Sequence, residues 1–261
     1  MGKQKVNIYN LSQLHSQSQR IEYGLSTLGL NGMLAFYNKI AKRAISDRYT
    51  PHDFLEDLLE KEFVLKEENR LQRSIMLARF PWIKILKEFD FSFQKDLDEK
   101  LIYELASCRF IEEAHNIVFF GPAGVGKTHL SISLGMEAIS KGYEVRFFTL
   151  SQLIDQVEKA EERTRTNILL GSLLRQKLLI LDEMDLYDVS QSVSNFLFKL
   201  LYQRHLKGSV IFTSNRSFDE WEKIFGSRVR ASAIIDRINE NCTRIIINGD
   251  SYRVKDRIRK V

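Results

Sequence analysis

The first third of the chain repeats apolar residues at helical spacing. They recur three and four positions apart from Leu25 to Ala44 and again from Phe54 to Phe63, which places them on one face of a helix. A further charged helix is expected from Glu67 to Arg79, ahead of a proline. We therefore predict a small helical domain over residues 1–80, in which residues 1–20 are polar and loosely ordered.

Beyond residue 105 the pattern changes to short apolar runs that alternate with amphipathic helices. Residues 81–105 form a connector, and residues 106–261 are expected to be one α/β domain. Apolar strands that alternate with helices predict a parallel sheet with helices on both faces. The expected strands are 117–120, 144–150, 177–183 and 209–215, and the expected helices are 97–109, 128–141, 151–164, a segment closing near 174, and 192–206.

Composition is that of an ordinary globular protein, with 44% hydrophobic and 28% charged residues. No apolar run approaches the roughly 18 residues that span a bilayer, and the N-terminus lacks the apolar core of a signal peptide. Cys108 and Cys242 are far apart and make neither a disulfide framework nor a zinc pattern, and the five histidines lack metal-ligand spacing. We expect a cytoplasmic protein with no membrane partner.

The net charge of +5 is concentrated at one end of the chain. From Gly226 to the C-terminus there are nine Lys or Arg against four Asp or Glu, so the remainder of the chain is neutral. This excess favours a polyanionic partner such as nucleic acid, although a solvated charged tail has the same composition.

The segment after the first expected strand matches the phosphate-binding pattern GxxxxGK[ST]. Its glycines let backbone N–H groups surround a polyphosphate, Lys127 reaches the β and γ oxygens, and the Thr128 hydroxyl ligates Mg²⁺. The helix that follows adds the positive end of its dipole. The expected nucleotide-binding residues are Gly121, Pro122, Ala123, Gly124, Val125, Gly126, Lys127, Thr128 and, as a helix residue beside the loop and not a catalyst, His129.

Two acids end the buried strand at 177–183. Asp182 is expected to hold Mg²⁺ through water, and Glu183 to orient or deprotonate the attacking water, because ligands sit at the carboxyl ends of such strands. The alternative is that these are ordinary acids at an exposed strand end. GTPases are disfavoured, because the sequence has no Asn-Lys-x-Asp motif.

Two further polar residues are candidates for the same site. Asn215 ends the next strand and could hydrogen-bond both the γ-phosphate and the lytic water, but it could equally be a turn former. Arg237 lies on an apolar, helix-like segment and is a candidate arginine finger, although an Asp-Arg pair is more often a surface ion pair.

The order of these motifs resembles the AAA+ ATPases of the IstB type, the helper proteins of IS21-family insertion sequences, which are related to the DnaC helicase loaders. The similarity covers roughly residues 25–255 and includes upstream segments as well as the motifs. It is carried by Gly-Pro-x-Gly-x-Gly-Lys-Thr-His-Leu, Leu-Leu-Ile-Leu-Asp-Glu, Thr-Ser-Asn-Arg-x-Phe-x-Glu-Trp, Asp-Arg and Gly-Asp-Ser-Tyr-Arg.

The resemblance implies an ATP-hydrolysing homo-oligomer that binds double-stranded DNA and recruits or stimulates the transposase of the same element. It implies that Arg237 acts on the ATP of a neighbouring subunit. It also implies a DNA-contacting helix within residues 156–175, with Lys159, Arg163 and Arg165 available, although a solvated face of mixed charge fits the same residues. The alternatives are a DnaC-like replicative helicase loader and a nucleotide-binding module with a degraded ATPase.

The chain departs from the family pattern at three places. Many members have Gly-Tyr-Leu-Pro where this chain has Asp185-Leu-Tyr-Asp, and Ser217 replaces the usual proline. Only 46 residues follow Asn215, too few for the helical lid of larger AAA+ proteins. Arg253 is therefore only a candidate for a second sensor arginine.

Overall fold

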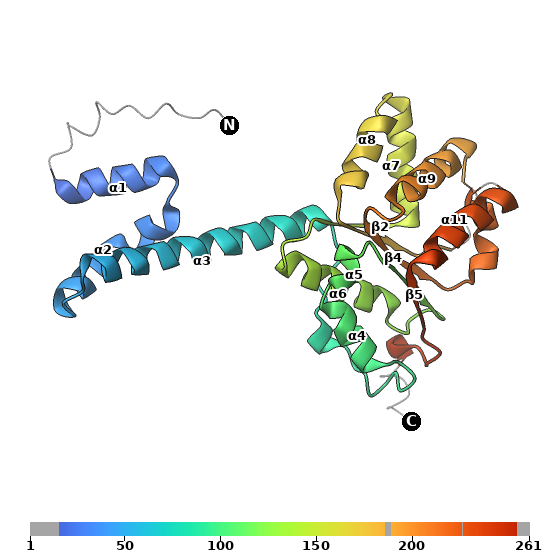
Figure 1. Cartoon of the computed structure of the whole chain (residues 1–261), viewed down its shortest axis with the longest axis horizontal. Coiled ribbons are helices and arrows are strands. Elements are labelled where there is room, and N and C mark those ends of the chain that lie inside the picture. Colours follow the sequence, from blue (N-terminus) through green and yellow to red (C-terminus); the bar gives the residue numbers. More distant parts are fainter. Residues whose placement is uncertain (1–15, 186–188, 226, 255–261) are drawn as a thin grey trace. The chain divides into compact units, whose positions relative to one another are not determined.

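The computed structural model describes residues 16–185, 189–225 and 227–254 (Figure 1). The chain divides into two compact units, residues 1–73 and 74–261. The division falls inside a long helix, whereas the sequence analysis set the end of the first domain at residue 80.

The N-terminal unit is helical, as predicted, and contains α1 (Gln17–Leu28), α2 (Asn31–Ser46) and the first part of α3 (Pro51–Ala78). The apolar pattern that runs from Leu25 onward belongs to two helices, because Gly29 adopts a left-handed conformation with φ 70° and ends α1. The core that joins the three helices consists of Met33 and Ile40 of α2 and Leu58 of α3, with the partly buried Leu25 of α1 packed against them.

α3 is one continuous helix, where the sequence analysis expected two. No glycine or proline interrupts it after Pro51, so nothing in its sequence breaks the hydrogen-bond ladder. Its start is fixed by a reciprocal cap in which the Asp53 backbone N–H donates to Thr50 Oγ1 and the Thr50 backbone N–H donates to Asp53 Oδ2.

The second unit is built on a five-stranded sheet in the order β2-β3-β4-β1-β5, and all of its neighbouring strands are parallel. This confirms the predicted parallel α/β fold. The strands are β1 (Asn116–Phe120), β2 (Val145–Thr149), β3 (Leu178–Asp182), β4 (Ser209–Ser214) and β5 (Cys242–Ile246). β5 is not among the expected strands, because its mixed sequence Cys-Thr-Arg-Ile-Ile has no sustained apolar run; it pairs along one edge of the sheet.

Helices cover both faces of this sheet (Figure 1). Alternate residues of β3 point to opposite faces, so Leu179 and Leu181 join one core cluster while Ile180 meets α6 at Gly135. On the face of Leu179 lie α7, α8, α9 and α11, and on the other face lies α6 with α4 against it. The helices are α4 (Glu99–Ala106), α5 (Arg109–Glu112), α6 (Lys127–Ser140), α7 (Leu150–Glu162), α8 (Thr166–Arg175), α9 (Gln191–Arg204), α10 (Glu222–Phe225) and α11 (Arg228–Glu240), with short 3₁₀ turns at Leu86–Glu88, Phe218–Trp221 and Tyr252–Val254.

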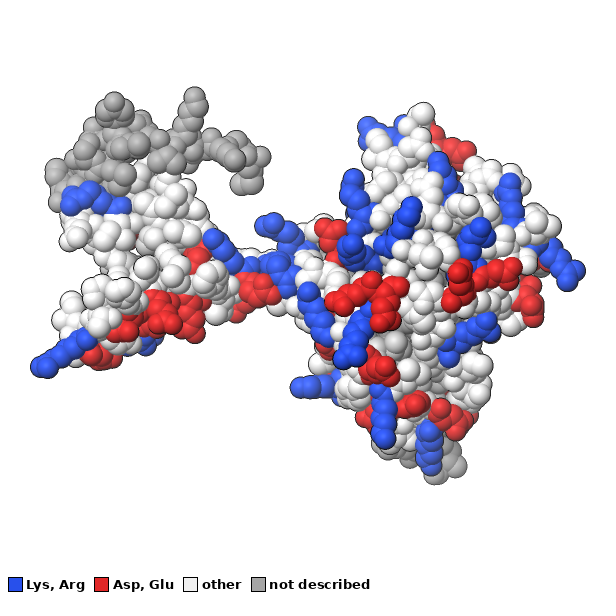
Figure 2. Space-filling view, in the orientation of Figure 1, with Lys and Arg blue, Asp and Glu red and all other residues white. Residues whose placement is uncertain are grey.

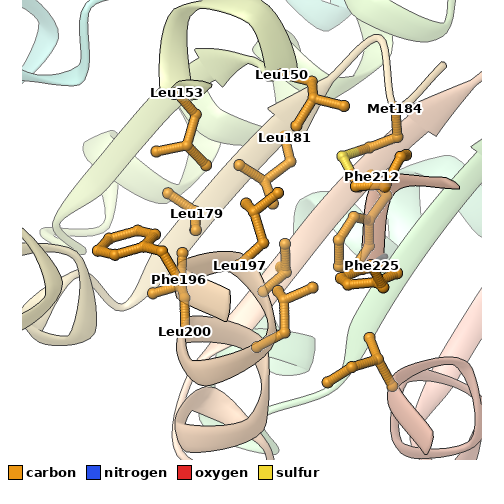
Figure 3. Packing of buried hydrophobic residues seen from close by; sticks show 14 of the residues in the cluster. Leu150, Leu153, Leu179, Leu181, Met184, Phe196, Leu197, Leu200, Phe212 and Phe225 are labelled. Atoms are coloured by element: carbon orange, nitrogen blue, oxygen red, sulfur yellow. The ribbon is translucent and has the colours of Figure 1, made fainter. Parts of the chain in front are cut away.

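The larger core cluster fixes the strand ends that carry polar residues. Figure 3 shows Leu181 of β3 and Phe212 of β4 packed with Leu197 of α9, and Met184 lies beside them just after β3. All four side chains are fully buried. This packing sets where the carboxyl ends of β3 and β4 stand relative to each other. Among the described residues, no helix has the length and apolar character required to cross a membrane.

Candidate functional site

The phosphate-binding loop joins β1 to α6, as the sequence pattern predicts. Gly121, Gly124 and Gly126 all have φ in the left-handed region, at 147°, 84° and 103°. A Cβ at Gly121 would lie 2.2 Å from the carbonyl oxygen of Ile247, and a Cβ at Gly126 would lie 2.5 Å from the ring of Phe89. Both the backbone conformation and the close neighbours therefore require glycine at these positions.

The Lys127 ammonium lies at the centre of the loop. Lys127 as a residue is 7% exposed, and its ammonium donates to the carbonyl oxygens of Gly121 and Pro122, each at 2.7 Å, and to Asn215 Oδ1 at 2.6 Å. Burial lowers the pKa of Lys127, and the nearby carboxylates of Asp185 and Asp182 oppose that shift. The structure thus brings the loop lysine and the predicted Asn215 into direct contact.

Asp182 lies beside Thr128 at the end of β3. The residue is 3% exposed, and its carboxylate accepts from Thr128 Oγ1 at 2.9 Å and from Thr213 Oγ1 at 2.6 Å. Burial raises the pKa of Asp182, and the two hydroxyl donors oppose the rise. A carboxylate and a hydroxyl are hard oxygen ligands, so this pair fits Mg²⁺. Thr213 is not among the predicted site residues, because nothing in the sequence distinguishes it from other residues of the strand.

Glu183 follows in a left-handed backbone conformation, with φ 57°. Its backbone N–H donates to Thr213 Oγ1 at 2.9 Å, and the residue is exposed. Thr213 therefore connects both acids, through the carboxylate of Asp182 and the backbone of Glu183. A non-glycine residue in this region carries backbone strain, which is common at functional sites.

Asp185 is a further site residue that the sequence analysis noted only as a departure from the family pattern. Its carboxylate accepts from the Asn215 backbone N–H at 3.0 Å and from Asn215 Nδ2 at 2.8 Å. It is also the carboxylate that most strongly favours the charged form of Lys127. Asp185 lies in a loop far from Asn215 in the sequence, so only the fold reveals this contact.

A cavity of about 380 Å³, which is more space than a phosphate group fills, adjoins the phosphate-binding loop. Residues 124–129 form one wall, and the connector forms another with Trp82, Phe89 and Gln94. Aromatic rings beside a phosphate site suit a nucleotide base. Arg253 lines the same cavity, so the structure brings this candidate near the loop. These connector residues carry no signal in the sequence: Phe89 belongs to Phe-Asp-Phe-Ser-Phe, which is too short a pattern to interpret, and Trp82 and Gln94 lie outside it.

His129 points toward that connector. Its Nε2 lies 3.2 Å from the carbonyl oxygen of Ile85, and its ring meets the edge of Phe89 at 5.3 Å between centroids. Burial lowers the pKa of His129, which favours the neutral ring at neutral pH. These contacts give His129 a packing role between α6 and the connector.

Arg237 lies on α11 and is not among the residues that the structure brings to the loop. Its guanidinium sits 4.5 Å from the centroid of the Tyr202 ring and donates to the carbonyl oxygen of Ala233 at 2.8 Å. Over the described residues, every contact recorded for this guanidinium is with α9 or α11. Neither of these contacts involves the phosphate-binding loop, Asp182 or Asn215.

The three predicted DNA contacts gather where α7 meets α8. Lys159 is in the last turn of α7, and Arg163 and Arg165 occupy the turn that follows, all of them exposed. Acidic neighbours share this end of the molecule, and Figure 2 shows blue and red side chains interspersed over the visible face of the unit. Within that view the acidic side chains of the N-terminal unit gather along α3.

Comparison with known proteins identifies close sequence relatives. The family model described as IstB-like ATP binding protein matches residues 24–260. The chain is 35% identical to the ATP-binding protein of insertion sequence IS21 from Pseudomonas aeruginosa, over 91% of this chain and 89% of that protein. It is also 35% identical to the ATP-binding protein of insertion sequence IS5376 from Geobacillus stearothermophilus, over 92% of this chain and 95% of that protein.

Solved structures add a likeness of fold. DnaA from Aquifex aeolicus, bound to AMPPCP, matches 70% of this chain and 56% of its own with a TM-score of 0.55 and 20% identity. At that level of identity the likeness concerns the fold alone.

Proposed function

This chain belongs to the family of IstB-like ATP binding proteins, and we propose that it is an ATP-hydrolysing transposition helper. In this proposal it assembles on double-stranded DNA as an ATP-dependent homo-oligomer in the cytoplasm and recruits or stimulates the transposase of its own insertion sequence. The observation that carries the proposal is the cluster of Lys127, Thr128, Asp182 and Asn215 at one end of a parallel sheet, in a chain related to insertion-sequence ATP-binding proteins.

The cluster supports hydrolysis by positioning and electrostatics. Residues 121–128 would bind the phosphates, and Lys127 would offset their charge. Thr128 and Asp182 would hold Mg²⁺, which neutralises charge as the terminal phosphoryl group transfers. Glu183, which is exposed beside Asp182, would orient or deprotonate the water, and Asn215 would contact the γ-phosphate.

The position of Arg237 supports an oligomeric site. An arginine finger must reach the transferring phosphoryl group, yet the recorded contacts of Arg237 lie on α9 and α11 of its own chain. The ring of Tyr202 holds the guanidinium by a cation–π contact at 4.5 Å, which leaves a positioned cation for a neighbouring subunit. ATP would then act as a clamp between two protomers.

The α7–α8 turn supports DNA binding through phosphates. Lys159, Arg163 and Arg165 are exposed there, and such contacts are salt-sensitive and largely independent of sequence. Replacing all three by Ala should weaken duplex binding and lower the slope of affinity against salt concentration. As a control, replacing three exposed cations outside the α7–α8 turn by Ala should leave the slope of duplex affinity against salt concentration unchanged.

The test of the proposal is a Lys127→Ala protein, with Lys207→Ala as the matched loss of an exposed lysine. Lys127→Ala should lose ATP-dependent oligomerisation and ATP-dependent binding to a DNA duplex, measured by light scattering and fluorescence anisotropy, while Lys207→Ala keeps both. Persistence of both properties in Lys127→Ala would refute the proposal.

Two companion assays separate the alternatives. A Glu183→Gln protein should bind ATP and remain assembled on DNA with hydrolysis reduced by about a hundredfold or more. Hydrolysis at the wild-type rate would instead support a nucleotide-binding module with a degraded ATPase. Capture of a hexameric helicase, and not of the element's transposase, by the tagged protein would favour a DnaC-like helicase loader.

A further inference from the structure

Asp185 and Lys127 hold the Asn215 amide from opposite ends. Asn215 Nδ2 donates to Asp185 Oδ2 at 2.8 Å, while Asn215 Oδ1 accepts from Lys127 Nζ at 2.6 Å. The Asn215 backbone N–H adds a third bond, to Asp185 Oδ1 at 3.0 Å. The charges at the two ends fix which amide atom faces which group, because a carboxylate only accepts and an ammonium only donates.

Asp185 is itself anchored by the end of β4. Ser214 Oγ lies 3.4 Å from Asp185 Oδ1, and its hydroxyl is within hydrogen-bond distance of two carbonyl oxygens, that of Arg216 at 2.8 Å and that of Met184, the residue before Asp185, at 3.0 Å. The backbone N–H of Asp185 donates to the carbonyl oxygen of Glu183 at 2.7 Å, in a tight turn after β3. The carboxylate therefore stands at a defined place beside Asn215.

This arrangement conflicts with a contact between Asn215 and a γ-phosphate. Phosphate oxygens carry no protons, so only Nδ2 of the amide can donate to them. The same Nδ2 is engaged by an anionic acceptor, and the amide presents its oxygen to the lysine that binds phosphate. A γ-phosphate would also add negative charge near the Asp185 carboxylate, which interacts electrostatically with Lys127.

We infer that Asp185 is a positioning residue that competes with the γ-phosphate of ATP for Nδ2 of Asn215, and thereby lowers the preference of the protein for ATP over ADP. The inference rests on the proposed role of Asn215 as the γ-phosphate contact. ADP lacks the γ-phosphate, so its binding does not require Asn215 to turn. Asp185 thus lowers the affinity for ATP, because the γ-phosphate must displace this carboxylate from Asn215 Nδ2, and leaves the affinity for ADP unchanged.

The test compares binding of Mg²⁺-AMPPCP and Mg²⁺-ADP by calorimetry in Asp185→Asn, Asp185→Ala and wild type. Asp185→Asn removes the charge at nearly constant size, and Asp185→Ala also removes the acceptor. We expect AMPPCP to bind Asp185→Ala roughly ten- to hundredfold more tightly than wild type, the scale of one hydrogen bond to a charged group, and ADP to change by less than about twofold. An equal change for both nucleotides, or weaker binding of AMPPCP, would overturn the inference.

A double-mutant cycle tests whether Asp185 acts through Asn215. In an Asn215→Ala background, Asp185→Ala should leave the AMPPCP-to-ADP affinity ratio unchanged. A full effect that persists there would mean that the carboxylate acts on the phosphate directly, and would refute the positioning role. Asp155→Asn, which removes an exposed acid on α7, controls for net charge.

Binding is measured without hydrolysis, DNA or transposase. A protein that binds AMPPCP but neither hydrolyses ATP nor assembles on DNA would refute the proposed function and leave the Asp185 comparison intact. Tryptophan fluorescence on urea unfolding of each variant shows that it is folded, because Trp82 and Trp221 both belong to the second unit.

Discussion

Replacing Thr213 by valine should destabilise the second unit and remove two hydrogen bonds that position Asp182 and Glu183. The Thr213 hydroxyl donates to Asp182 Oδ1 at 2.6 Å and accepts from the Glu183 backbone N–H at 2.9 Å. The residue is 1% exposed, so water cannot readily take the place of the hydroxyl. Valine has nearly the same shape, which isolates the loss of the two hydrogen bonds from any change in packing.

The expected cost follows from these two bonds. A hydrogen bond to a buried carboxylate contributes about 1.5–3 kcal/mol, and an unpaired backbone N–H costs about 1–3 kcal/mol when it is buried. Glu183 is exposed, which lets water relieve part of the second penalty. We therefore expect the free energy of unfolding to fall by about 2–4 kcal/mol in magnesium-free buffer.

The loss of stability caused by Thr213→Val should increase as pH rises. Burial raises the pKa of Asp182, so its contribution to stability is greatest below the unfolded pKa and is lost as pH rises through the folded pKa. The Thr213 hydroxyl opposes that rise by donating to the ionised form. Removing it raises the folded pKa further, so the cost of Thr213→Val should be larger at pH 8 than at pH 5.

The assay is urea unfolding followed by tryptophan fluorescence, which reports on the second unit alone because Trp82 and Trp221 both lie in it. Thr213→Ser is the matched control, since it keeps the hydroxyl and removes only the methyl group. It should lose less than about 1.5 kcal/mol. Equal losses for the two variants, or a valine penalty independent of pH, would refute the reasoning.

Three further predictions follow from local geometry. Gly121→Ala should weaken AMPPCP binding by at least about tenfold in calorimetry, because its Cβ would lie 2.2 Å from a backbone carbonyl oxygen. Gly171→Ala is the control: its Cβ would have no atom within 4 Å, so this variant should bind AMPPCP normally and be more stable to unfolding by about 0.5–1 kcal/mol. Glu62→Gln should destabilise the N-terminal unit by about 1–3 kcal/mol, because its carboxylate accepts from two backbone N–H groups at the start of α2 at 2.8 and 3.1 Å; thermal unfolding followed by far-ultraviolet circular dichroism measures this. Burial opposes ionisation of Glu62, but these bonds and a neighbouring lysine lower its pKa overall. The stability that Glu62 contributes in the wild type should therefore be present above about pH 4.5 and be lost as pH falls through the folded pKa. A wild-type stability that does not change over this acid range would contradict the prediction. Burial raises the pKa of Cys108 to about 11 and that of Cys242 to about 12. Mass spectrometry should therefore show that iodoacetamide at pH 8 labels neither thiol appreciably in the folded protein and labels both in urea. Rapid labelling of the folded protein would contradict the burial of these thiols.

The site divides into parts that the sequence predicts and parts that it does not. The glycine pattern and Lys127 are local, because a phosphate-binding loop requires a fixed spacing along one turn. Asp182 and Asn215 could be expected near that loop, since the carboxyl ends of neighbouring parallel strands meet at one edge of a sheet. The structure places Lys127 and Asn215 in direct contact.

Partners from distant segments could not be predicted in the same way. Thr213 is one of several polar residues in an apolar strand, and its choice of Asp182 depends on the register of β3 against β4. Asp185 meets Asn215 across 30 positions of sequence. The wall formed by Trp82 and Phe89 depends on how the connector folds back over the loop, which no short pattern encodes.

By itself, the sequence determined the helical first unit, the alternation of strands and helices, and the residues of the phosphate-binding loop, because periodicity and loop spacing act over a few residues. Only the tertiary structure decided that α3 is continuous, that β5 closes one edge of the sheet, and that Asp185 and Lys127 share the amide of Asn215. Those outcomes depend on packing and strand register, which join residues far apart in the chain.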